Sequence, residues 1–246
     1  MRTEPARTTA RTTAGTAAGT DVAGVLREVA ALGPFFTLST DPAEAADPAW
    51  RPMPEIDAAQ LRGMAERYAE GLGTGEPRVG ASILFQGLAA RVWSPAVAAA
   101  ALGVVPNLST LHWRWVPGAS ISLRLAEPTG WHTGGRTRDG AALLHRTVVD
   151  GHLRPLREAM REVARLADGL MWGNVASALV GTVHAATARP ELAAPVRALI
   201  DDLLLREPLL GTGSFGRAGF VRRSCCLYYR VPPGGEMCGD CGLRKH

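Results

Sequence analysis

Apolar residues recur at helical spacing along most of the chain. This spacing predicts a first helix over residues 22–32, ending at Gly33-Pro34, and an amphipathic helix over residues 56–72. Residues 79–103 are rich in alanine and apolar on every side, which predicts one or two buried helices with a break at Ser94-Pro95. Three more helices are expected further along the chain, over residues 153–167, 168–187 and 190–206.

The middle of the chain shows the period-two pattern of strands. Residues 111–125 alternate with aromatic and β-branched positions around a Pro-Gly turn, which predicts a β-hairpin. A second short strand pair is expected at residues 142–144 and 147–149. Residues 41–54 contain four prolines and are expected to form an irregular connection. The expected fold class is therefore mainly α with a small β element (α+β), followed by a loop-rich C-terminal tail.

Composition limits the classes of protein to be considered. Of the 246 residues, 46% are hydrophobic and 20% charged, which allows a substantial core and excludes global disorder. The most apolar stretch, residues 79–105, is interrupted by Gln86, Arg91 and Pro95, so no membrane-spanning helix is expected. The net charge of +4 comes from 26 arginines and one lysine, and the arginines are scattered. Scattered charge makes no basic face, so no nucleic-acid partner is expected.

The cysteines are confined to one end of the chain. All four lie within the last 22 residues, and the first 20 residues lack the apolar core of a secretory signal. We therefore expect reduced thiols in the cytoplasm, with a peripheral position at the inner face of the membrane as an alternative. The expected organisation is a disordered segment at residues 1–20, a mostly helical domain at 21–210 and a metal-binding segment at 211–246.

The cysteine spacing is typical of a metal site. Cys225-Cys226 is separated by eleven residues from Cys238-Gly-Asp-Cys241. A Cys-x-x-Cys turn brings two thiolates to the same side of the chain, and Gly239 is expected to relieve strain in it. Neighbouring side chains of an extended chain point to opposite faces, so the adjacent pair shares a site only if the backbone bends there.

The residues alone leave the metal open. Four thiolates suit either an all-cysteine zinc site or a [2Fe–2S] cluster. Structural zinc ribbons pair two separated knuckles, and adjacent cysteines are a poor half of such a pair. Zinc and an iron–sulfur cluster therefore both remain, with a redox disulfide as a third alternative.

Two segments of the tail resemble the FhuF-like family of ferric-siderophore reductases. They are residues 222–230 (RRSCCLYYR) and 238–241 (CGDC). The resemblance implies a [2Fe–2S] cluster in an iron–sulfur tail, ligated by Cys225, Cys226, Cys238 and Cys241. The loop between the cysteine pairs has eleven residues where the family usually has ten, and the Pro-Pro-Gly-Gly turn is expected to absorb the extra one. Weaker similarity covers residues 81–87, 93–95 and 171–177.

The residues around the cysteines are candidates for tuning the cluster or receiving a substrate or donor. Arg222, Arg223 and Arg230 would offset the negative charge of a four-thiolate cluster and raise its reduction potential, or they are solvated charges in an arginine-rich protein. Tyr228 and Tyr229 are adjacent, so one is expected to pack inward while the other faces solvent or ligand.

Other motifs are weaker. Residues 211–216 (GTGSFG) match G-x-G-x-x-G, but a helix and not a strand is expected before them. They are therefore interpreted as a flexible approach to the cluster and not as a dinucleotide site. The histidines are dispersed, and His184 on an apolar helical face is interpreted as a core residue.

The resemblance implies an enzyme of the oxidoreductase class, a cytoplasmic ferric-siderophore reductase acting on hydroxamate-type siderophores. The protein would supply no catalytic acid, base or nucleophile beyond the cluster. With no flavin or NAD(P)H motif recognised, an external donor such as a ferredoxin or flavin reductase is expected. Two alternatives stay open: an iron- or redox-sensing regulator holding Fe–S or zinc, and a siderophore-binding domain with a structural zinc.

Overall fold

The computed structural model describes residues 21–53, 55–116, 118–186, 189–217 and 219–244, without the side chains of 184–186. Within them the fold is mainly α with small β elements, as predicted. Residues 1–20, Pro117 of the predicted turn and the side chain of His184 lie outside this description.

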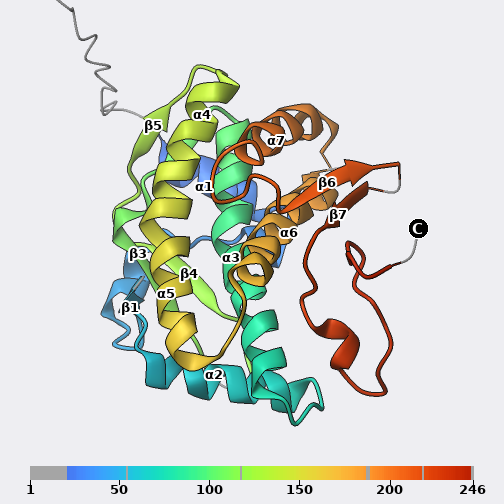
Figure 1. Ribbon diagram of the computed structural model, residues 1–246. Coiled ribbons are helices and arrows are strands. Elements are labelled where there is room, and N and C mark those ends of the chain that lie inside the picture. The colour runs from blue at the N-terminus through green and yellow to red at the C-terminus, as the bar shows by residue number, and fades with distance from the viewer. Residues whose placement is uncertain (1–20, 54, 117, 187–188, 218, 245–246) are drawn as a thin grey trace, which may run out of the picture.

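The elements follow one another along the chain in Figure 1. The helices are α1 (Val22–Ala30), α2 (Ala58–Gly71), α3 (Pro77–Ala101), α4 (Thr137–Leu144), the π-helical η4 (His145–Leu153), α5 (Arg154–Val163), α6 (Asp168–Ala186) and α7 (Pro190–Leu203). The strands are β1 (Arg51–Pro52), β2 (Val104–Pro106), β3 (Leu111–Arg114), β4 (Ser122–Leu125), β5 (Gly130–His132), β6 (Gly213–Gly216) and β7 (Gly219–Arg222). Short 3₁₀ turns include η1 (Pro34–Phe36), η2 (Pro42–Ala46), η3 (Leu108–Thr110) and η5 (Tyr228–Arg230).

Helix α3 runs through the middle of the molecule, and α2 and α6 pack against it (Figure 1). It is one continuous helix, so the predicted break at Ser94-Pro95 is wrong. A proline inside a helix costs about 3 kcal/mol, and burial of almost every residue around Pro95 offsets that cost. Close approach of α2 depends on Gly80, because a Cβ there would lie 2.1 Å from the Ala65 carbonyl oxygen.

The core position of α3 also explains its composition. Among the described helices, α3 alone is long and apolar enough by composition to cross a membrane, where the sequence led us to expect no membrane-spanning helix. However, 72% of its apolar stretch is buried inside the protein. A core helix packed against other helices has this pattern as well.

The β elements are small antiparallel sheets. The predicted hairpin is present as β3 and β4, with Leu111 paired to Leu125, and β1 adds to its edge. Strands β2 and β5 form a further pair that the sequence pattern did not indicate. Residues 41–53 are mainly irregular around η2 and β1, and Pro54 of the predicted connection lies outside the described residues.

The predicted strand pair at residues 142–149 is wrong, because these residues form the end of α4 and the start of η4. Val148 and Val149 favour strands by intrinsic propensity. However, Ala141, Leu144 and Val148 are buried at helical spacing, and α4 packs against α7. Tertiary packing of this helical face therefore overrides the local preference.

His152 of η4 gives the fold a pH-sensitive point. Its Nε2 lies 3.0 Å from the Leu108 carbonyl oxygen, to which it donates, while its buried Nδ1 has no partner in the described structure. Burial lowers the pKa of His152 from 6.5 to about 4. Since the unfolded chain takes up this proton at a higher pH than the folded chain, stability is lost as the pH falls from about 6.5 towards 4.

We expect His152→Gln to remove this pH dependence. The stability advantage of the wild type over His152→Gln should shrink by about 2 kcal/mol between pH 7 and pH 5, measured by urea denaturation. The same change at the exposed His132 is the matched control. A stability difference between the wild type and His152→Gln that stays constant from pH 7 to pH 5 would contradict a lowered pKa of His152 in the folded protein.

Candidate metal centre

The β6–β7 hairpin delivers the chain to the cysteine-bearing tail. Residues 213–216 form β6, the first strand of this hairpin, and residues 211–212 lead into it, where the sequence led us to expect a flexible approach to the cluster. Gly213 packs under the Phe220 ring, where a Cβ would lie 2.4 Å from the ring. A strand paired in a hairpin is not the strand-to-helix turn of a dinucleotide site. The hairpin ends at Arg222, three residues before Cys225.

The adjacent cysteines share a site because the backbone bends directly after them. Leu227 has φ +71°, the left-handed conformation that a residue with a branched side chain rarely adopts. Its amide donates to the Cys225 Sγ at 3.3 Å. The Ser82 hydroxyl of α3 donates to the Cys226 carbonyl oxygen at 2.7 Å and attaches the bend to the core. The bend that the sequence led us to expect at the adjacent cysteines is therefore present at Leu227, directly after them.

A turn at Gly234-Gly235 returns the chain to the second pair of cysteines. Both glycines have φ +91°, which a non-glycine residue rarely adopts, and the Gly235 amide donates to the Tyr229 carbonyl oxygen at 2.9 Å. The returning segment then lies beside β7, because the Arg222 amide donates to the Asp240 carbonyl oxygen at 3.1 Å.

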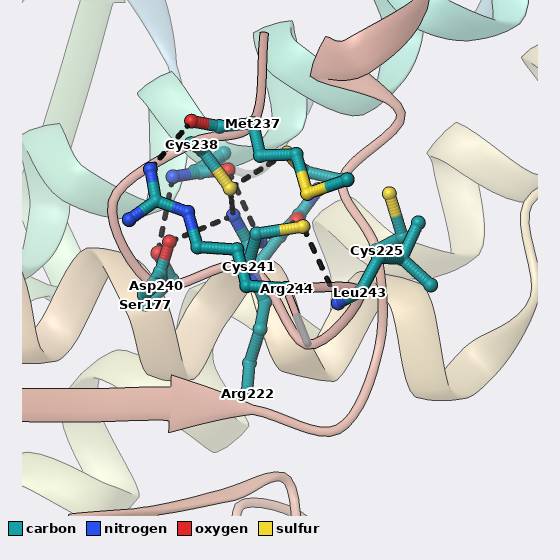
Figure 2. A network of polar contacts seen from close by, with 12 residues as sticks. Ser177, Arg222, Cys225, Met237, Cys238, Asp240, Cys241, Leu243 and Arg244 are labelled. Carbon is teal, nitrogen blue, oxygen red and sulfur yellow. Dashed lines mark hydrogen bonds and ion pairs between the residues drawn. The ribbon is translucent and has the colours of Figure 1, made fainter. Parts of the chain in front are cut away.

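Figure 2 shows Cys225, Cys238 and Cys241 in the same part of this loop. The Sγ atoms of Cys226 and Cys238 are 3.5 Å apart. The Leu243 amide donates to the Cys241 Sγ at 3.4 Å, matching the amide contact that Leu227 makes with Cys225. Each cysteine pair therefore has a sulfur that accepts from the backbone amide two residues later.

The thiol pKa values reflect this crowding. The hydrogen bond with Cys238 lowers the pKa of Cys226 to about 7, and the Arg222 charge acts in the same direction. The pKa of Cys238 is raised, because Cys226 and Cys238 share a proton. Burial raises the pKa of Cys225, and the neighbouring Cys241 and Cys238 thiols add to that effect. Several thiolates this close together repel one another, so these thiols lose their protons most readily when they bind a metal.

Arg222 is the cation at the centre of the site. Its side chain is fully buried, and its guanidinium donates to the Cys238 Sγ at 3.0 Å and to the Asp240 carboxylate at 3.1 Å. It also donates to the side-chain oxygen of Asn174 in α6 at 2.6 Å and to that of Gln86 in α3 at 3.5 Å. Although burial lowers the pKa of Arg222, the charges of Cys226, Asp240 and Cys238 raise it overall, so the group stays charged.

The other flanking residues are distributed around this centre. Arg223 is exposed on the hairpin, and Arg230 forms an ion pair with Glu76 at 2.8 Å. Tyr228 lines a cavity together with Cys226 and Cys238. Tyr229 packs against the hydrophobic core.

Sequence reasoning missed the polar contacts that surround Arg222. Asn174 donates to the Ser82 carbonyl and hydroxyl oxygens at 2.9 and 3.0 Å while it accepts from Arg222. Asn174 and Ser82 are fully buried polar residues in otherwise apolar helices. A buried polar residue needs a partner. The presence of Asn174 and Ser82 in buried helices therefore indicated in the sequence that polar contacts form there. The sequence does not say which partner each residue has.

The donor set fits an iron–sulfur cluster. Within the described residues, no group of three or more histidine, cysteine, aspartate or glutamate side chains converges closely enough to hold a single metal ion. A zinc ion needs four sulfurs about 2.3 Å from one point, whereas a two-iron cluster spreads its four thiolates over two metals. Four neighbouring thiols, a buried arginine on one sulfur and amides on two others are a donor set that suits a thiolate-bound centre of either kind.

The second cysteine pair depends on Gly242 more than on Gly239. A Cβ at Gly242 would lie 2.2 Å from the Arg222 carbonyl oxygen, whereas a Cβ at Gly239 would meet nothing within 4 Å. The described structure therefore gives no steric reason for glycine inside the Cys-x-x-Cys turn, contrary to expectation. Glycine is required one residue after the turn, where the tail lies against β7.

Gly242→Ala is therefore expected to displace the tail. The added Cβ would clash with backbone atoms of Arg222 and Arg223. Overpacking of this kind lowers folding stability by about 1–3 kcal/mol. We expect metal content per protein, measured by elemental analysis, to fall several-fold in Gly242→Ala, while Gly239→Ala binds as much metal as the wild type. Equal loading of the two variants would contradict this packing argument.

Comparison with known proteins supports an iron–sulfur assignment for the tail. Residues 222–242 match the family model of the FhuF 2Fe-2S C-terminal domain, which confirms the resemblance noted from the cysteine motif. The match covers the segment from Arg222 to Gly242 and not the helical body. No curated protein and no solved structure matches the chain.

Proposed function

We propose that the protein is a ferric-siderophore reductase in which Cys225, Cys226, Cys238 and Cys241 hold a [2Fe–2S] cluster. The observation that carries this proposal is the four-thiol site itself, within a segment that matches an iron–sulfur domain and beside the buried Arg222. A buried permanent cation on a ligand sulfur suits a centre that changes charge by one electron.

When bound, the cluster supplies one electron, which converts the Fe(III) of a chelate to Fe(II), and an external one-electron donor such as a ferredoxin or flavin reductase replaces it. Hard oxygen ligands hold Fe(III) tightly and Fe(II) poorly, so reduction releases the iron. The proposed substrates are hydroxamate-type siderophores, in line with the resemblance, and the proposed location is the cytoplasm.

The residues of this chain act by position and charge. The bend at Leu227 and the Gly234-Gly235 turn bring the two cysteine pairs together. Arg222 stabilises negative charge on the thiolates, and Asn174 and Gln86 fix its guanidinium from two helices. Because the added electron increases the negative charge of the centre, a fixed cation there favours the reduced state.

A single-turnover experiment tests this function. Anaerobic protein is reduced with dithionite, desalted and mixed with a ferric trihydroxamate and a coloured Fe(II)-specific chelator. The proposal predicts about one Fe(II) per cluster, together with return of the oxidised visible spectrum. Ferricyanide is the control oxidant. A protein that ferricyanide reoxidises, but that yields no Fe(II) from any ferric siderophore, would contradict the proposal.

A further inference from the structure

A cavity of about 600 Å³ lies against the candidate metal centre. One face of α3, including Ile83, Gln86 and Gly87, lines it opposite Ser177 and Ala178 of α6. Aromatic rings from η1, α2 and η5 complete the lining, and Tyr228 is one of them. We call this space the α3–α6 cavity. Its volume lies within the range of small-molecule sites.

The α3–α6 cavity is open because both helices present small residues to it. A Cβ at Gly87 would come no closer than 4.0 Å to its nearest neighbour, the Tyr68 hydroxyl, and a Cβ at Gly181 would meet nothing within 4 Å. Ala90 and Ala178 also line the space. Larger side chains at these positions would fill the cavity without displacing the backbone.

Cys226 and Cys238 line the cavity. A molecule in the cavity would therefore lie beside two of the four proposed ligand residues of the cluster. Cys225 and Cys241, by contrast, are not among the described residues that line it. Cys226 and Cys238 are thus the ligand residues through which a cluster held here would face the cavity.

The described lining of the α3–α6 cavity offers no cationic side chain to an anion. Apart from the two cysteines and the tyrosines, it has no ionisable side chain. Burial raises the pKa of Tyr68, so its hydroxyl stays neutral. Arg91 lies over the Phe35 ring and its charge acts on Tyr68, but its guanidinium donates to the Pro34 carbonyl oxygen and Arg91 lines a different, smaller cavity.

The metal centre itself adds negative charge to the wall. A four-thiolate [2Fe–2S] centre would carry more than one negative charge, so the wall would stay net negative even though Arg222, which also pairs with Asp240, offsets part of it. An anionic chelate would therefore lose its hydration in a mostly apolar space and face a like charge. An uncharged chelate meets neither cost.

We infer that the α3–α6 cavity is the binding site of the ferric chelate and that it selects uncharged complexes over anionic ones. This inference rests on the proposed function. Aromatic and aliphatic surface supplies the binding energy, and Ser94 together with the hydrogen-bonded pair Gln86 and Ser177 makes up the uncharged polar part of the lining. The bound metal lies against the Cys226 and Cys238 side of the cluster.

Gallium(III) complexes test binding apart from reduction, because gallium(III) takes the place of iron(III) but is not reduced. The neutral gallium complex of desferrichrome and the trianionic gallium complex of enterobactin are titrated into the holoprotein and followed by calorimetry. The inference predicts at least about 100-fold tighter binding of the neutral complex. Equal or tighter binding of the trianion would overturn the charge selection.

Side chains that fill the cavity test its location. Gly87→Leu and Gly181→Leu are expected to weaken binding of the neutral gallium complex about tenfold or more. Gly169→Leu is the matched control, because Gly169 also lies on α6 with nothing within 4 Å of its Cβ position but does not line the cavity. An unchanged visible spectrum shows that each variant keeps its metal centre. Unchanged binding in both cavity variants would overturn the location.

The outcomes separate this inference from the proposed function. If the cavity variants bind and reduce the neutral ferric complex like the wild type, the location is wrong and the reductase function stands. If the gallium complex binds in the cavity but the reduced protein yields no Fe(II), the cavity is confirmed as a site for metal chelates and the proposed reductase function is wrong.

Discussion

Cys238→Ser is expected to abolish iron–sulfur loading and ferric-siderophore reduction together. Cys238 contacts both Cys226 and Arg222, so its loss removes a thiolate from the centre of the site. We expect at least about a tenfold loss of bound iron, because metal sites lose that much even when only a supporting residue is changed. Iron and sulfide analysis, with Fe(II) release measured on the same samples, checks both parts.

Met237→Leu is the matched control for Cys238→Ser. Met237 is the neighbouring residue and carries the one sulfur in residues 222–242 that does not belong to a cysteine. It is partly exposed, so leucine is accommodated at similar volume. Met237→Leu should keep its iron. Catalytic Fe(II) release by a Cys238→Ser protein without a cluster would refute the mechanism.

Arg222→Gln is expected to lower the reduction potential of the centre by about 100 mV. The guanidinium lies 3.0 Å from the Cys238 Sγ, and a charge at 5–6 Å from the metal is worth about 2–3 kcal/mol at the effective dielectric of a protein. Removing this cation also leaves the Asp240 carboxylate without its ion pair. Both changes disfavour the added electron. Spectroelectrochemical titration measures the shift.

Two further variants keep this prediction testable. Arg222→Lys retains the positive charge, so its reduction potential is expected to shift less than that of Arg222→Gln. It replaces Arg222→Gln in the titration if that variant binds too little iron to be measured. Arg223→Gln removes the neighbouring arginine, which is exposed and therefore screened, and should change the potential little. A shift of the same size in Arg223→Gln and Arg222→Gln would show that the buried contact has no special role.

The sequence predicted the helices and the cysteine site better than it predicted their connections. Helical spacing located α1, α2 and α5 to α7, and the pattern at residues 111–125 located the β3–β4 hairpin. The errors at Ser94-Pro95 and at residues 142–149 share one cause. In both places a local preference was overridden by burial against other helices, which no local pattern contains.

The polar contacts of the metal centre depend on long-range packing. Arg222 reaches Asn174 across 48 residues and Gln86 across 136. The cysteine spacing predicted which thiols gather. It did not predict that a buried cation joins them, or that Gly242 allows the tail to lie against β7. Both depend on which segments become neighbours once the chain has folded.

The visible absorption spectrum of anaerobically purified protein, recorded before and after dithionite, tests the central claim most directly. The account predicts a red-brown oxidised protein that bleaches on reduction and whose colour returns on addition of a ferric hydroxamate siderophore. A colourless protein with stoichiometric zinc, still colourless after cluster reconstitution, would contradict it and make the four cysteines a structural zinc site.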